Sequence, residues 1–295
     1  MNDLHWLTLK EASVAIQSGT LSPVEYTKAL ISRTEQLDPK LNAYIKFTPE
    51  RALSDAHKAE DIIQRNKSIT PMTGIPYGLK DIIDVEGFEN TAHSKILLSN
   101  ISEKNAYVTD KLISSGGILM GKLALHEFAI GGPAFDLPFP PARNPWNINH
   151  HPGGSSSGSG SAVASGMLPA ALGTDTGGSV RNPATSCGIV GMKATYGRVS
   201  KSGVMPLSFS LDHVGPMTRT VEDNAILLNA IAGYDKNDPS TEQNQKLPDF
   251  TEFLQKGVSG LRIGLIRHFY TTDLKAEDEM CKAIDNAAET FRKLG

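Results

Sequence analysis

The chain has 295 residues, a formal net charge of −3 and a sequence pI near 6.2, and 39% of its residues are hydrophobic. This composition is typical of a globular protein and excludes a disordered chain. The near-neutral charge argues against a nucleic-acid surface, which would cluster lysine and arginine. Two cysteines, Cys187 and Cys281, are too few for a disulfide framework or a cysteine-based zinc site, so a reducing compartment is expected.

The N-terminus carries Asp3, His5 and Lys10 where a signal peptide would need an apolar core. No stretch approaches the roughly 18 uninterrupted apolar residues of a membrane span. We therefore expect a cytoplasmic protein that does not bind a membrane.

The first 65 residues predict helices that pack on a larger core formed by residues 66–295. Thr8 precedes the periodic residues 9–16 as a helix N-cap, and the pair Ser22-Pro23 opens a helix over residues 24–37. An alanine-rich stretch predicts a further helix over residues 50–63.

After Gly74, short apolar runs alternate with helical patterns, which favours an α/β fold with a mixed, largely parallel central sheet flanked by helices. The apolar runs are residues 77–84, 116–123, 167–173, 188–193 and 261–266, and the helical patterns are 107–114 and 221–231. A polar stretch, residues 235–248, predicts an exposed loop. The run 261–266 predicts a strand that leads into a final amphipathic helix over 276–294. Another strand usually follows in such folds, so we expect the core to be incomplete at its C-terminal end.

Residues 151–166, HPGGSSSGSGSAVASG, are either a flexible linker or part of a structured site. The run continues into small apolar residues, and a second glycine cluster, GTDTGGSVRNPATSCG, follows. Two such clusters predict paired tight turns around a site. In the second cluster, glycines allow consecutive N–H groups to converge on an oxyanion beside Ser179, a candidate nucleophile.

The sequence alone does not identify the base that would activate such a serine. The G-x-S-x-G elbow fails because Arg181 replaces the second glycine, and no serine has a lysine three residues later. A histidine base remains open, with His93, His126, His150, His151 and His213 as candidates. Lys80 is a further candidate, because burial could lower its pKa from about 10.4 to about 7.5 at a cost of roughly 4 kcal/mol. Composition alone favours instead a surface lysine paired with Asp81 or Asp84.

The stretches GIPYGLKD, PGGSSSGS, GTDTGGSVRNPA and TYGRVSKSGVMPLSFSLDHVGPMTRTVED resemble the amidase signature family, over roughly residues 5–295. The resemblance implies a serine amidohydrolase that acts on linear amides through a Ser–cis-Ser–Lys triad, with no metal or cofactor. Lys80 would then be the base, Ser155 the bridging serine and Ser179 the nucleophile. The resemblance also implies main-chain oxyanion donors at Thr176, Gly177 and Gly178. From their positions beside the two glycine clusters, we expect Asp175, Arg181 and Ser156 to support the loops by hydrogen bonds.

Residues 126–150 are rich in Phe, Pro and Gly. They predict either an apolar wall with substrate contacts from Phe128 and Phe135, or a proline-rich surface loop. The expected partner is a small-molecule amide, and a homodimer is compatible with the sequence.

Three alternatives stay open. The chain could be the A subunit of a glutamyl-tRNA amidotransferase, which releases ammonia from glutamine, although residues 131–147 favour a stand-alone amidase. It could also be an incomplete or inactive family member. A nucleotide binder is the third alternative, but the G-x-x-x-x-G-K match at residues 116–122 is followed by Leu123, which lacks the hydroxyl that magnesium needs.

Overall fold

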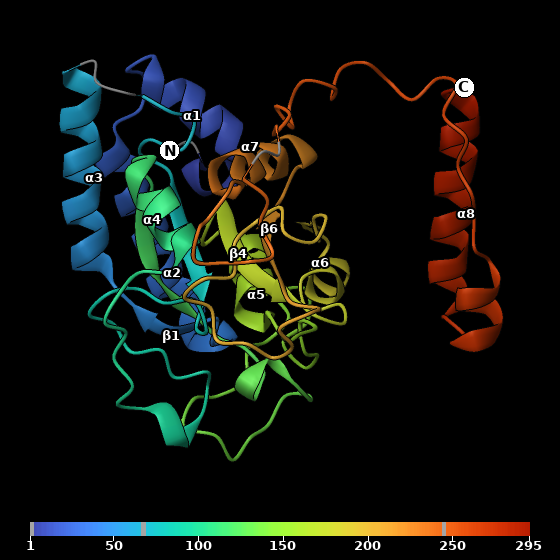
Figure 1. The fold of residues 1–295 in the computed structure, drawn as a ribbon, viewed down its shortest axis with the longest axis horizontal. Coiled ribbons are helices and arrows are strands. Elements are labelled where there is room, and N and C mark those ends of the chain that lie inside the picture. Colours follow the sequence, from blue (N-terminus) through green and yellow to red (C-terminus); the bar gives the residue numbers. More distant parts are fainter. Residues whose placement is uncertain (1–2, 66–68, 244–245) are drawn as a thin grey trace. The chain divides into compact units, whose positions relative to one another are not determined.

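The computed structural model describes residues 3–65, 69–243 and 246–295. They form two compact units, Met1–Asp249 and Phe250–Gly295 (Figure 1). The first unit contains a mixed sheet and the helices that pack on it, and the second contains one long helix. Within the described residues, no helix is both long and apolar enough to cross a membrane.

The first unit is built on six strands in the order β1-β3-β2-β4-β6-β5. Their bounds are β1 Tyr44–Phe47, β2 Pro76–Lys80, β3 Ile118–Leu123, β4 Ala170–Asp175, β5 Val190–Gly191 and β6 His213–Thr218. β2 is parallel to β3 and to β4, whereas the β1–β3, β4–β6 and β5–β6 pairs are antiparallel. The predicted mixed sheet is confirmed. Because parallel strands end at one edge, Lys80 and Asp175 both finish their strands at the same side of the sheet.

The helices of the first unit are α1 Leu9–Gln17, α2 Pro23–Leu41, α3 Pro49–Gln64, α4 Tyr107–Ser114, α5 Ser157–Ala164, α6 Arg181–Cys187 and α7 Val221–Ile231. Two of them, α1 and α2, begin at the N-caps that the sequence predicts. Thr8 and Glu11 form a complete capping box, and Ser22 Oγ accepts hydrogen bonds from the N–H groups of Val24 and Glu25. Short 3₁₀ turns cover Leu4–Trp6, Lys95–Leu97 and Glu127–Ala129.

The core lies along the central strands, since every residue of β2, β3 and β4 is buried. Helix α5 contacts all three of these strands. The nucleotide-binding alternative is wrong, because residues 118–123 are a buried strand rather than a phosphate loop. Lys122 of this strand forms an ion pair of 2.7 Å with Asp81, and both side chains are at most 1% exposed.

Three features differ from the sequence prediction. Strands β1 and β6 were not predicted, and β1 makes the N-terminal 65 residues more than a helical segment. The predicted strand at 261–266 is wrong, because these residues have no strand conformation and pair with no neighbour among the described residues. In the predicted exposed loop 235–248, Asp235, Asp238 and Thr241 are buried, while residues 244–245 lie outside the described residues.

The second unit consists of irregular chain, a π-helical turn at Phe269–Asp273 and helix α8, Asp278–Lys293. The final helix was predicted. Arg267 pairs with Asp285 of α8 at 2.7 Å, which ties the preceding segment to the helix.

Candidate active site

Lys80 is the last residue of β2, and its side chain is fully buried. Its Nζ lies 2.7 Å from Ser155 Oγ and 2.8 Å from Thr174 Oγ1. The surface-lysine alternative is therefore wrong, and Asp81 pairs with Lys122 instead. Two hydroxyls and no carboxylate surround this amine at hydrogen-bond distance within the described part of the chain.

This surrounding changes the acid–base properties of Lys80. Burial lowers its pKa from the usual 10.5 to about 7, and the more distant charges of Asp175 and Asp212 only partly oppose the shift. A large fraction of the amine is thus neutral at pH 7. A neutral amine has a lone pair that can accept a proton from a neighbouring hydroxyl.

The loop that carries Ser155 is held from several sides. The Gly154–Ser155 peptide bond is cis. The N–H of His126 donates to Ser155 O at 3.0 Å, and the His126 ring lies so close to Gly154 that a Cβ there would come within 2.1 Å of it. Ser156 Oγ bonds both the N–H and the C=O of Thr174 at 3.2 Å, which fastens the loop to β4.

Asp175 organises the turn that follows β4. Its buried carboxylate accepts hydrogen bonds from the N–H groups of Gly178, Val180 and Arg181 and from the Arg181 guanidinium, the latter at 2.9 Å for each contact. Burial alone would raise the pKa of Asp175, but these donors outweigh it and lower the pKa. The turn is therefore fixed around an ionised carboxylate. Because the Gly178 N–H already donates to Asp175, it is not free for an oxyanion.

Ser179 lies in this turn and is partly exposed. Its C=O accepts from the N–H of Ser156 at 3.2 Å, so the turn and the Ser155 loop lie side by side. Among the described residues, the Ser179 hydroxyl makes no hydrogen bond. The structure thus joins Lys80 to Ser155 by side chains, and the Ser155 loop to Ser179 through the backbone.

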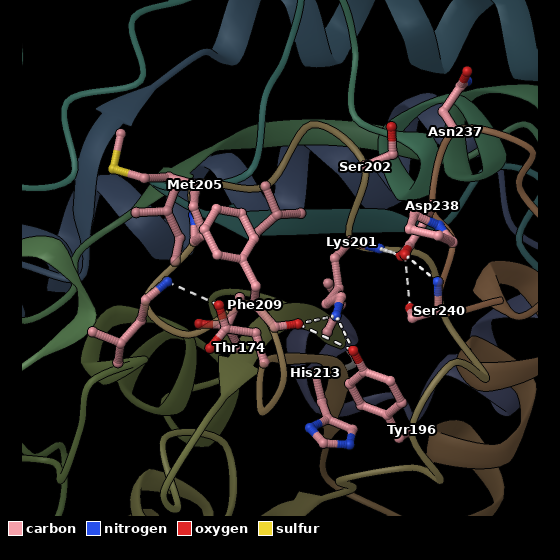
Figure 2. Close-up of a pocket in the computed structure, with 17 residues that line it drawn as sticks. Thr174, Tyr196, Lys201, Ser202, Met205, Phe209, His213, Asn237, Asp238 and Ser240 are labelled. Carbon is pink, nitrogen blue, oxygen red and sulfur yellow. Dashed lines mark hydrogen bonds between the residues drawn. The ribbon is translucent and has the colours of Figure 1, made fainter.

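A cavity of about 460 Å³ adjoins this arrangement (Figure 2). It touches the site at two residues: Thr174, which is bonded to Lys80, and Asp212, whose Oδ1 accepts from Thr176 Oγ1 at 2.5 Å. The rest of its wall comes from residues 196–214 and 237–240, together with Ile82. Lys80, Ser155 and Ser179 themselves do not line it.

The two phenylalanines predicted to contact substrate lie elsewhere. Phe128 packs against a buried cluster that includes Ile82 and Leu125. Phe135 is 72% exposed and lies near the Arg143 guanidinium. Neither lines the cavity of Figure 2.

One residue of the site was missed at the sequence level: Thr174, which sits inside the quoted motif GTDTGGS near the end of β4. His126 was considered only as a possible base, and no sequence pattern predicts its contact with Gly154. Lys201 lines the adjoining cavity, and nothing in the sequence distinguishes it from a surface lysine. Cys187 is buried, and burial raises the pKa of its thiol to about 12.

The mixed sheet, the buried Lys80 and the loop that carries Ser155 are the features by which this chain can be assigned to a family of proteins. The chain belongs to the amidase family, whose model matches residues 25–295.

The curated relatives that it matches include subunits of a larger enzyme. The A subunit of glutamyl-tRNA(Gln) amidotransferase from Geobacter metallireducens is 45% identical over 293 residues, which are 99% of this chain and 60% of that protein. The same subunit from Chloroflexus aggregans is 42% identical over 295 residues, again 60% of its length. The chain thus spans about 60% of the length of these relatives.

Solved structures show the same fold. The peptide amidase of Stenotrophomonas maltophilia superposes with a TM-score of 0.89 at 35% identity, covering 98% of this chain and 61% of that one. The A subunit of glutamyl-tRNA(Gln) amidotransferase from Thermotoga maritima gives a TM-score of 0.86 at 35% identity, covering 100% and 61%. Fold similarity therefore does not separate stand-alone amidases from amidotransferase subunits.

Proposed function

We propose that this chain hydrolyses carboxamides through an acyl-enzyme on Ser179, with Ser155 and Lys80 relaying the proton. The single observation that supports this most strongly is the buried Lys80 amine, which has a pKa of about 7 and lies 2.7 Å from Ser155 Oγ. Membership of the amidase family supports the same reaction class.

The reaction begins with proton transfer along the relay and attack on the amide carbon. Neutral Lys80 accepts the Ser155 proton, Ser155 accepts the Ser179 proton, and Ser179 Oγ forms a bond to the amide carbon. This relay requires the Ser179 hydroxyl to close on Ser155 when substrate binds, and such contacts are often looser without substrate. The carbonyl π electrons move onto oxygen and produce an oxyanion.

The oxyanion would be stabilised by main-chain N–H groups of the turn. Gly178 N–H is engaged by Asp175, which leaves Thr176, Gly177 and the Ser179 N–H as the donors we propose. Loss of one such donor typically costs about 3 kcal/mol of transition-state stabilisation. The relay then returns its proton to the leaving nitrogen, the C–N bond breaks, and water releases the acid by the same path.

A second candidate is glutamine hydrolysis for a partner subunit. The curated relatives at 42–45% identity are named as the A subunit of an amidotransferase, whereas the residue pattern at 131–147 favours a stand-alone amidase. Glutaminase activity that appears only when a partner subunit is added would support the second candidate. Hydrolysis of simple amides by the chain alone would support the first.

Covalent labelling tests the mechanism. A fluorophosphonate probe followed by peptide mass spectrometry should place one adduct on Ser179, and both Ser179→Ala and Lys80→Met should abolish labelling at pH 7. The exposed serine at position 210 offers a matched control, since Ser210→Ala should label like the wild type. An adduct on any other serine, or undiminished labelling of Lys80→Met, would overturn the assignment.

A further inference from the structure

Lys201 carries a positive charge into the cavity of Figure 2, and its hydrogen-bond partners there are neutral. We propose that this cavity selects amides that carry a carboxylate, and that Lys201 binds that carboxylate. The inference rests on the proposed function, because it names the substrate class for the same site.

Two acceptors of the protein fix the position of the Lys201 ammonium group and leave one of its N–H donors free. Its Nζ donates to Phe209 O at 2.8 Å and to Tyr196 Oη at 3.0 Å, and it lies 4.4 Å from the centroid of the Tyr196 ring. An ammonium has three N–H donors, so one remains for a ligand. In the described part of the chain, no carboxylate lies within 4.0 Å of this nitrogen.

The two acids in the cavity wall are already satisfied by donors of the protein. Asp212 accepts from Thr176 Oγ1 and from the N–H groups of Leu207 and Ser208. Asp238 accepts from the N–H of Lys201 and from both the N–H and the hydroxyl of Ser240. Each carboxylate therefore bonds to neutral N–H and O–H groups. Neither one neutralises the Lys201 ammonium by direct contact.

The cavity, with a volume of about 460 Å³, also has a lining that suits such a substrate. Thr174 and Asp212 connect it to Lys80 and to the turn that carries Ser179, so an amide at the turn would direct its chain into the cavity. Val204, Met205 and Leu207 line the space and suit a methylene spacer. The substrate class is therefore a short chain with the amide at one end and a carboxylate at the other.

Three matched amides test the proposal on the whole chain: glutaramate, the neutral pentanamide and the cationic 5-aminopentanamide. We expect kcat/KM to be highest for glutaramate and lowest for the ammonium compound. Because a hydrogen bond to a charged group contributes strongly, the preference for glutaramate over pentanamide should be about tenfold or more. Lys201→Met should remove this preference, and Lys201→Arg should retain it.

The charge-matched control is Lys236→Met, since Lys236 is exposed and does not line the cavity; it should keep the preference. Equal rates for glutaramate and pentanamide, a preference for the ammonium compound, or an unchanged preference in Lys201→Met would each overturn the proposal. Calorimetric titration of Ser179→Ala with glutaramate separates this proposal from the catalytic one. Binding that depends on Lys201, with no turnover by the wild type, would refute the proposed hydrolysis and leave the carboxylate site standing.

Discussion

Replacing Lys80 with methionine should stabilise the protein while it abolishes amide hydrolysis. The fully buried amine has a pKa of about 7 in the folded state, against 10.5 ordinarily. This difference corresponds to a folding cost of roughly 4–5 kcal/mol at pH 7. Methionine avoids that cost but leaves the hydroxyls of Ser155 and Thr174 without their amine partner, a loss of about 1–2 kcal/mol each. The net gain should be about 1–2 kcal/mol.

The pH dependence of the stability difference between wild type and Lys80→Met reports on Lys80, because the two proteins differ only at this residue. Between pH 7 and 10.5 the unfolded state binds more protons at Lys80 than the folded state, so wild-type stability rises with pH. The cost is full below pH 7 and absent above 10.5. Wild type should therefore gain about 1.4 kcal/mol per pH unit relative to Lys80→Met across this window.

Urea unfolding of both proteins at pH 7, 8 and 9, followed by circular dichroism, measures the difference. Lys236→Met is the control, since it makes the same change at an exposed lysine. A pH-independent difference for Lys80→Met, or a variant several kcal/mol less stable than wild type at pH 7, would refute a buried neutral amine.

Two further substitutions test how the site is held. Gly154→Ala should lower the free energy of unfolding by about 2 kcal/mol or more and reduce labelling of Ser179, because its Cβ would meet the His126 ring at 2.1 Å; Gly177→Ala, with nothing within 4 Å of its Cβ, is the stability control and should change unfolding by less than about 0.5 kcal/mol. Equal stabilities for the two alanine variants would show that the His126 contact does not constrain the loop. Asp175→Asn should cost about 2–4 kcal/mol in chemical denaturation, because it disrupts the acceptor of five hydrogen bonds while Arg181 stays partly solvated. The lowered pKa of Asp175 means that its contribution is present above the ordinary carboxyl range and is lost as pH falls through the folded-state value, so wild type should lose stability on acidification more steeply than Asp175→Asn. Parallel pH curves for the two proteins would contradict this.

Much of the fold follows from local signals in the sequence. The caps at Thr8 and Ser22 are read directly, because a hydroxyl before a periodic run satisfies N–H groups that the helix leaves free. The helices at Tyr107–Ser114 and Val221–Ile231 have the predicted bounds. Strand β1 was missed because it has four half-buried residues with no distinctive pattern. The run 261–266 is apolar, but a strand also needs a neighbour to pair with, and sequence periodicity does not supply one.

The site, like the fold, could be predicted from the sequence only in part. Glycine and serine clusters predict a structured loop, and the resemblance selects Lys80, but only the structure gives its burial and its bonds to Ser155 and Thr174. His126 contacts Gly154 from a segment 28 residues away in the chain. Lys201 lines the cavity together with residues 237–240, which are distant from it in the sequence. Such long-range contacts leave no local signal.

The most direct measurement is the rate of Ser179 acylation by the fluorophosphonate probe as a function of pH from 5 to 9. If neutral Lys80 is the base, the rate should be low at pH 5, rise through a half-maximum near pH 7 and level off above it, following the pKa of the buried amine. A rate that does not vary over this range, or one that still climbs at pH 9 as an ordinary lysine would require, would contradict the mechanism.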